Sequence, residues 1–95
     1  MLDLKKVLTD LDGNSLTTLN GKPLTLGKAI SDAFANGHRD VTDAKQKLAF
    51  YALAKTFNTS SEIELDETMK NDIGLLVNSC YPPLIVGQIW EELNK

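Results

Sequence analysis

Two dipeptides typical of tight turns, Asp12-Gly13 and Asn20-Gly21, divide the first quarter of this 95-residue chain into short segments. An Asp-Gly or Asn-Gly pair between apolar runs is a strong sign of a β-hairpin, because these residues tolerate the backbone angles that a tight turn requires. The flanking runs, residues 4–11 and 15–19, contain β-branched Val and Thr and are typical of strands. We therefore predict one or two β-hairpins over residues 7–24.

The same stretch contains the one spacing that is typical of a metal loop. Asp10, Asp12 and Asn14 place oxygen atoms at alternate positions, as the first three side-chain ligands of an EF-hand calcium loop do. Such a loop normally has Gly at position six and a bidentate Glu at position twelve, where this chain has Ser15 and Gly21. We interpret the stretch as turn residues and predict no metal site, and a calcium-binding module is kept as an alternative function.

Apolar residues recur with helical spacing in four later segments, which begin near residues 25, 40–42, 66 and 83. Thr25 and Asp66 are suited to cap the first and third helices, and Pro83 fits the first turn of the fourth. Apolar residues cover a wide sector of the second helix, so we expect it to lie centrally with neighbours on several sides. The alternation at residues 62–65 predicts a short strand at residues 63–65 that joins the sheet of the hairpin.

The predicted fold is therefore α+β, with an N-terminal β-hairpin plus a short third strand, packed with about four α-helices. We find no internal repeat, low-complexity segment or linker, and expect a single compact domain over residues 1–95. No apolar run reaches the roughly 20 residues of a membrane span, and the N-terminus lacks the apolar core of a signal peptide. Together with a single cysteine, these features predict a cytoplasmic protein without an intramolecular disulfide.

The charge of the chain argues against nucleic acid as a partner. The net charge is −3 and the isoelectric point is about 5.0, whereas a phosphate-binding surface needs concentrated Lys and Arg. The ten basic residues are spread along the sequence. If the chain nevertheless binds DNA or RNA, we expect the contacts to come from Lys5, Lys6, Lys22, Lys28 and Arg39.

No constellation of side chains in the sequence predicts catalysis. His38 is the only histidine and lies in a predicted loop, while Cys80, the one candidate nucleophile, lies on the apolar stripe of its helix. Four carboxylates lie close together in the sequence, at Glu62, Glu64, Asp66 and Glu67. We expect the first two on the solvent face of a strand and the last two at a helix N-terminus, where negative charge is stabilising, so the cluster does not indicate catalysis. We predict that the protein is not an enzyme, takes no cofactor and has no small-molecule substrate.

The C-terminal segment provides the stronger indication of function. Residues 81–93 are more apolar than one buried helix stripe requires, and the segment contains an aromatic residue near each end. Exposed apolar surface and aromatic anchors are typical of protein interfaces. We predict that Tyr81, Leu84, Ile85 and Trp90 form an interface with a protein partner or with a second copy of the chain.

Several segments resemble those of small uncharacterised proteins encoded by tailed bacteriophages and prophages. They are Leu8-Thr-Asp-Leu-Asp-Gly-Asn14, Gly21-Lys-Pro-Leu-Thr-Leu-Gly27, Lys47-Leu-Ala with Leu53-Ala-Lys55, Glu64-Leu-Asp66 and Tyr81-Pro-Pro-Leu-Ile-Val-Gly87-Gln. The resemblance implies a bacterial cytoplasm during infection or lysogeny and an accessory or regulatory role. It brings no catalytic residues with it. The sequence thus predicts a small non-enzymatic protein-interaction or regulatory domain, with calcium binding or nucleic-acid binding as the alternatives.

Overall fold

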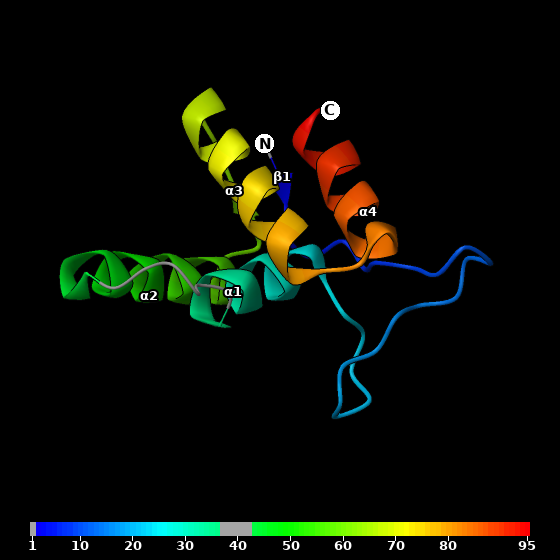
Figure 1. Cartoon of the computed structure of the whole chain (residues 1–95). Helices are drawn as coiled ribbons and strands as arrows, with labels where there is room; N and C mark the ends of the chain where they lie inside the picture. The colour runs from blue at the N-terminus through cyan, green and yellow to red at the C-terminus, as the bar shows by residue number, and fades with distance from the viewer. Residues whose placement is uncertain (1, 37–42) are drawn as a thin grey trace.

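The computed structural model describes residues 2–36 and 43–95. In this part of the chain, a helical body carries a projecting N-terminal segment (Figure 1). The order of elements is β1 (Leu2–Asp3), α1 (Leu26–Asn36), α2 (Ala44–Thr59), β2 (Glu62–Ile63), α3 (Glu67–Cys80) and α4 (Pro83–Leu93). Helix α1 packs most extensively on α2, and α3 packs on both α4 and α1.

The four predicted helices are confirmed, and their caps explain where they begin. Thr25 Oγ1 accepts a hydrogen bond from the backbone N–H of Lys28, and Asp66 Oδ1 accepts one from that of Met69. These bonds satisfy N–H groups that have no partner inside the helix. Asp43 caps α2 in the same way, whereas Asp40 and Thr42, the predicted start of that helix, lie outside the described residues.

The predicted α+β fold class is wrong. Of the described residues, 59% are helical, and their regular strands are the two-residue antiparallel pair β1–β2. The short strand predicted at residues 63–65 is found at residues 62–63 and pairs with β1, not with the segment around the turns. Residues 7–25 form isolated bridges instead of a hairpin ladder, because the chain changes direction after every few residues.

The reason is an eight-residue repeat that we did not find in the sequence. Leu8-Thr-Asp-Leu-Asp-Gly-Asn-Ser15 aligns with Leu16-Thr-Thr-Leu-Asn-Gly-Lys-Pro23, and a third copy begins at Leu24-Thr25 and continues into α1. The first leucines of the three copies form a closed ring of backbone hydrogen bonds, which we term the leucine ring. The N–H groups of Leu8, Leu16 and Leu24 donate to the carbonyls of Leu24, Leu8 and Leu16, at 2.8, 2.9 and 2.7 Å.

The bridges repeat the same symmetry. Thr9 pairs with Ser15 and Thr17 pairs with Pro23, one repeat later, while Val7 pairs with Thr25. Each segment therefore has one bridge to each of its two neighbours, as in a triangle viewed along its axis. A ladder of two long strands cannot form in this arrangement, which accounts for the absence of the predicted hairpin sheet.

The core lies between the helices and the first eight residues. Leu4 and Leu8 are fully buried together with Leu26 and Ile30 of α1. Between α1 and α2, the ring of Phe34 stacks on that of Phe57 at a centroid distance of 5.6 Å. The buried hydroxyl of Ser31 donates a 2.7 Å hydrogen bond to the carbonyl of Ala54, so the one buried polar side chain among the described residues is satisfied.

The prediction of a central α2 is wrong. Of its sixteen residues only Ala54 and Phe57 are buried, and the first half of the helix extends beyond the body (Figure 1). Its wide apolar sector therefore exceeds what the described part of the chain covers. By contrast, α3 and α4 meet closely, because Gly74 leaves room for the indole of Trp90, which a Cβ at position 74 would approach to 2.5 Å.

Two helical glycines provide opposite tests of this packing. A Cβ at Gly27 would lie 2.8 Å from the carbonyl oxygen of Phe57 and 3.0 Å from that of Leu4, whereas nothing lies within 4 Å of one at Gly87. We expect Gly27→Ala to lower the free energy of unfolding by about 1–3 kcal/mol through overpacking. Gly87→Ala should raise it by about 1 kcal/mol through helix propensity. Chemical denaturation measures both, and equal effects of the two changes would contradict the packing described for α1.

Candidate functional site

The two turns of the repeat project from the body as a double-turn arm, which we define as residues 10–22 (Figure 1). In the first turn, the N–H of Gly13 donates to the carbonyl of Asp10, and the N–H of Asp10 donates to that of Asn14. The second turn repeats both bonds one period later, from Gly21 to Thr18 and from Thr18 to Lys22. Three-residue turns of this kind end in a left-handed residue.

Glycine supplies that left-handed residue in both turns. The φ angles are +88° at Gly13 and +78° at Gly21, a region that other residues enter only with strain. The prediction that both dipeptides form turns is therefore confirmed, although the segments between them are not strands of a sheet.

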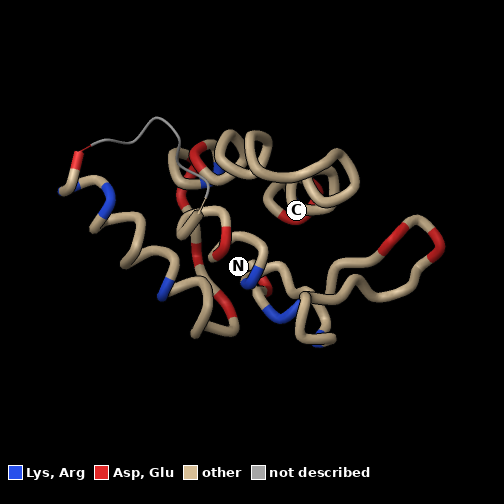
Figure 2. Tube along the Cα trace, turned by 60° about the horizontal axis from the view of Figure 1, so that its bottom comes forward, with Lys and Arg blue, Asp and Glu red and all other residues tan. Residues whose placement is uncertain are grey.

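Each turn presents a leucine at its tip. Leu11 is 93% exposed, and Leu19 is fully exposed at the equivalent position of the second repeat. The surroundings of the two leucines differ in charge, because the first turn also carries Asp10 and Asp12, while the second carries Lys22 (Figure 2). The arm thus offers two apolar side chains on similar backbones with different polar neighbours.

Asp10 is occupied in organising the first turn. Its Oδ1 atom accepts hydrogen bonds from the backbone N–H groups of Asp12 and Asn14, both at 2.9 Å. In the alternative of a calcium-binding module, one of the candidate ligands is therefore a carboxylate oxygen that already bonds the backbone. Within residues 2–36 and 43–95, no group of three or more His, Cys, Asp or Glu side chains is arranged to hold a metal ion.

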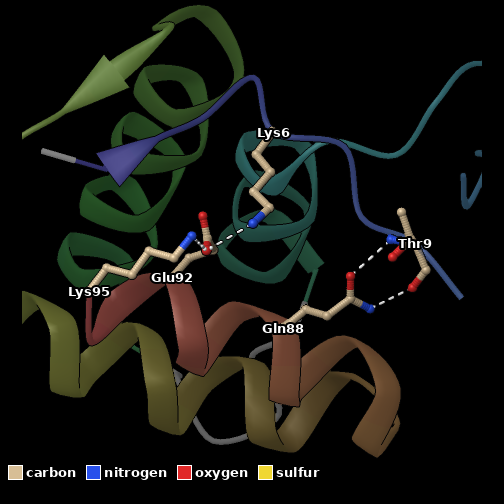
Figure 3. Close-up of polar contacts among 5 residues, drawn as sticks. All are labelled: Lys6, Thr9, Gln88, Glu92 and Lys95. Carbon is tan, nitrogen blue, oxygen red and sulfur yellow. Dashed lines mark hydrogen bonds and ion pairs between the residues drawn. The ribbon is translucent and has the colours of Figure 1, made fainter. Parts of the chain in front are cut away.

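A glutamine of α4 fixes the base of the arm. Gln88 Oε1 accepts a 2.9 Å hydrogen bond from the N–H of Thr9, and its Nε2 donates a 2.7 Å bond to the carbonyl of the same residue (Figure 3). Nε2 also donates to the carbonyl of Leu84. The side-chain amide acts as a neighbouring strand would, and joins positions 79 residues apart.

An ion-pair network lies beside this contact. The carboxylate of Glu92 accepts from Lys6 Nζ at 3.1 Å and from Lys95 Nζ at 2.6 Å (Figure 3). Burial of the Glu92 carboxyl raises its pKa, but hydrogen bonds and charge attraction from Lys95 and Lys6 outweigh burial, so the pKa lies below its usual value. The network connects α4 to the N-terminal segment on the side of β1.

A hollow of about 320 Å³ separates the arm from α4, and one of the predicted interface residues lines it. Leu84 is half-buried there, opposite Leu8 and Leu11. The hollow is lined by apolar side chains, by Gln88, which bonds Thr9 at the base of the arm, and by Glu92, which pairs with Lys6. It is therefore a shallow surface feature at the base of the arm.

The other three predicted interface residues contact the chain's own helices. The hydroxyl of Tyr81 donates a 2.6 Å hydrogen bond to the carbonyl of Ala29, and burial raises the pKa of Tyr81 to about 12. Ile85 packs against the core. Trp90 is 38% exposed, with its ring over Gly74. Leu84, Ile85 and Trp90 lie in α4 and Tyr81 just before it, but much of the apolar surface of these four residues is used inside the molecule.

Those of the remaining candidate residues that the structure describes do not gather into one site. Cys80 is half-buried, and His38, the only histidine, lies outside the described residues, as does Arg39. Two of the predicted nucleic-acid contacts are engaged in ion pairs, Lys6 with Glu92 and Lys28 with Asp32. The predicted acidic cluster is divided among a strand, a cap and a helix: Glu62 lies in β2, Glu64 follows it, Asp66 caps α3 and Glu67 pairs with Lys70.

Sequence reasoning missed Leu11 and Leu19 as candidate functional residues. The sequence pattern predicts strands over residues 4–11 and 15–19, and these runs include Leu11 and Leu19. The signal that identifies them is the eight-residue period, which gives both leucines the position before Asp-Gly or Asn-Gly.

Comparisons of the chain with family models, with curated proteins and with solved structures find no match. None of the helices in the described ranges has the length and apolar character needed to cross a membrane.

The hydrogen bonds from Gln88 to the base of the arm, which we term the clamp, can be tested by removing the side-chain amide. Gln88→Ala loses three hydrogen bonds and leaves the half-buried backbone of Thr9 without this partner. We expect the free energy of unfolding to fall by about 1–3 kcal/mol. The control is Gln46→Ala on the exposed face of α2, which should change it by less than about 0.5 kcal/mol. If both changes have the same effect in urea denaturation, the clamp contributes no stability.

The ion-pair network predicts a loss of stability in acid. Because the pKa of Glu92 is lower in the folded chain than its ordinary value of 4.5, protons bind preferentially to the unfolded chain. The stabilisation is complete above pH 4.5 and is lost as the pH falls through the lowered pKa.

Replacement of the carboxylate isolates this contribution. We expect Glu92→Gln to be less stable than the wild type near neutral pH and to approach it in acid, as measured by urea denaturation across that range. Glu91→Gln, at the adjacent exposed position, is the matched control and should keep the acid dependence of the wild type. A parallel decline of the wild type and Glu92→Gln would show that the network does not contribute.

Proposed function

We propose that the chain is a small non-enzymatic protein-interaction domain that binds its partner through the double-turn arm. The observation that carries the proposal is the pair of exposed leucines, Leu11 and Leu19, at equivalent tips of the arm. Single exposed leucines are common on protein surfaces. Two of them at matching positions of a repeat, on turns that project into solvent, form a recurring apolar contact point.

Burial of these leucines supplies a driving force for association. Transfer of a leucine side chain from water to an apolar site contributes about 1.5–3 kcal/mol. Within the described chain neither leucine belongs to the buried core. Their apolar surface is therefore available to a partner without any rearrangement of the domain.

The turns are also suited to binding because their backbones are held in place. Each is closed by two backbone hydrogen bonds, and the first is closed further by Asp10. The leucine ring and Gln88 hold the base of the arm. A loop that is ordered before binding loses less conformational entropy in the complex.

The resemblance to small proteins of tailed bacteriophages and prophages supports a setting for this activity. In that setting, the domain acts in a bacterial cytoplasm as an accessory or regulatory factor for a phage or host protein. A second copy of the chain is the alternative partner, in which case the arm or the C-terminal residues Tyr81, Leu84, Ile85 and Trp90 form a homodimer. Light scattering after size exclusion distinguishes a homodimer from a monomer that binds another protein.

The arm is tested with the double variant Leu11→Ser/Leu19→Ser. We expect affinity capture from a bacterial lysate to recover at least one protein with the wild type and about tenfold less of it with the double variant, because apolar anchors dominate binding. Mass spectrometry with isotope labels measures the ratio.

The control is Leu75→Ser, which removes an exposed leucine from α3 and should leave the captured proteins unchanged. Circular dichroism checks that both variants are folded. Equal capture by the wild type and the double variant, or a captured protein that is lost only with Leu75→Ser, would contradict a role for the arm.

A further inference from the structure

The outward face of α2, at the end of the molecule away from the arm (Figure 1), is a second surface with exposed apolar side chains. The buried residues Ala54 and Phe57 define the inward face of this helix. At 100° per residue, Leu48 and Ala52 lie on the opposite face together with Lys45 and Lys55, and Ala44 lies at its edge; all five residues are exposed. Leu48 is 68% exposed.

The spacing on this face is suited to another helix. Leu48 has an alanine one turn before it and another one turn after it, at i−4 and i+4. The large side chain of Leu48 therefore projects between two small ones, with a shallow depression over each alanine. A second helix can approach such a face closely and place its own large residues over the alanines.

The charged residues of α2 have one sign. Lys45 and Lys55 lie on the outward face, Lys47 lies beyond its edge toward the inward side, and the sixteen residues of the helix include no Asp or Glu (Figure 2). The chain as a whole carries a net charge of −3, so the basic helix contrasts with the rest of the molecule. Lys55 Nζ also lies 5.2 Å from the centroid of the Tyr51 ring, which orders the two side chains along the edge of the face.

We propose that this face of α2 binds an acidic amphipathic helix of another protein. The apolar side of that helix would cover Leu48 and its flanking alanines, and its Glu or Asp residues would meet the three lysines. Complementary charges along the edges of a helix pair favour one partner and disfavour others. The surface is separate from the double-turn arm, so this inference does not depend on the proposed function.

A second copy of α2 does not satisfy the same surface. In an antiparallel pair that places Leu48 of one copy over Ala52 of the other, Lys45 of one copy would lie level with Lys55 of the other, and α2 has no acidic residue between them. Like charges at such positions destabilise a helix pair. Membrane-surface helices usually combine a strongly basic face with several large apolar residues, whereas this face has one leucine and two alanines.

A hollow at the edge of the face offers a place for one large side chain of the partner. It has a volume of about 210 Å³ and lies between the end of α1 and α2, beside Lys47 and Tyr51. Its inner wall includes the rings of Phe34 and Phe50. An apolar residue on the edge of the bound helix would contact these rings.

The test uses a designed peptide as the probe. It is a fluorescein-labelled amphipathic helix of Leu, Ala and Glu, and a matched peptide has Lys in place of every Glu. We expect fluorescence anisotropy to show binding of the acidic peptide to the full chain, about tenfold tighter than the basic peptide. Three ion pairs of a few tenths of a kcal/mol each account for that ratio. Added salt should reduce it.

Variants of α2 make the test specific. Leu48→Ser should weaken binding about tenfold, as expected for a central apolar anchor. The matched control Leu75→Ser removes a leucine that is also 68% exposed, on α3, and should bind as the wild type does. The variant Lys45→Glu/Lys47→Glu/Lys55→Glu should reverse the preference and bind the basic peptide better. Circular dichroism confirms that each variant is folded.

Four results would overturn the proposal. They are equal binding of the two peptides, unchanged binding by Leu48→Ser, no binding of the acidic peptide at several hundred micromolar, and a preference that the charge-reversed variant does not reverse. Sedimentation with anionic phospholipid vesicles is run in parallel. Vesicle binding that depends on Leu48, in the absence of peptide binding, would assign the face to a lipid surface instead.

Discussion

The structure depends on the extended N-terminal segment, which supplies hydrogen bonds to three separate parts of the chain. The N–H of Leu4 donates to the carbonyl of Ser61, while the carbonyls of Leu4 and Lys6 accept from Gly27 and Leu26 at the start of α1. These bonds satisfy N–H groups that an isolated helix leaves without partners. With the side chains of Leu4 and Leu8 fully buried, the segment places α1, the β1–β2 pair and the leucine ring relative to one another.

The parts of the fold that local sequence determines were predicted well. Caps at Thr25 and Asp66, a proline at position 83 and periodic apolar residues act within one or two turns of a helix, so the sequence contains the information directly. The turns at Gly13 and Gly21 were found for the same reason. The leucine ring was not predicted, because three segments bridging in a triangle have the same local pattern as a hairpin.

The candidate site was harder to predict, because exposure depends on how much surface the rest of the chain covers. The wide apolar sector of α2 indicated a central helix, yet the chain buries only two of its residues. The apolar C-terminal segment indicated an interface, yet Tyr81 bonds to Ala29 and Trp90 fills the space over Gly74. In both cases the sequence correctly indicated more apolar residues than one buried stripe needs. Which of these residues are buried and which are exposed depends on the tertiary structure.

Because backbone atoms close the leucine ring, the groups that maintain this scaffold are distinct from the side chains at the turn tips. Main-chain groups make its three bonds, so side chains at the turn tips can diversify without weakening the scaffold beneath them. The glycines at 13 and 21 fix the shape of each tip, while Leu11, Asp12, Leu19 and Asn20 lie in solvent. A domain built in this way can acquire a new specificity by substitution at a few tip positions, as loops on a rigid framework do.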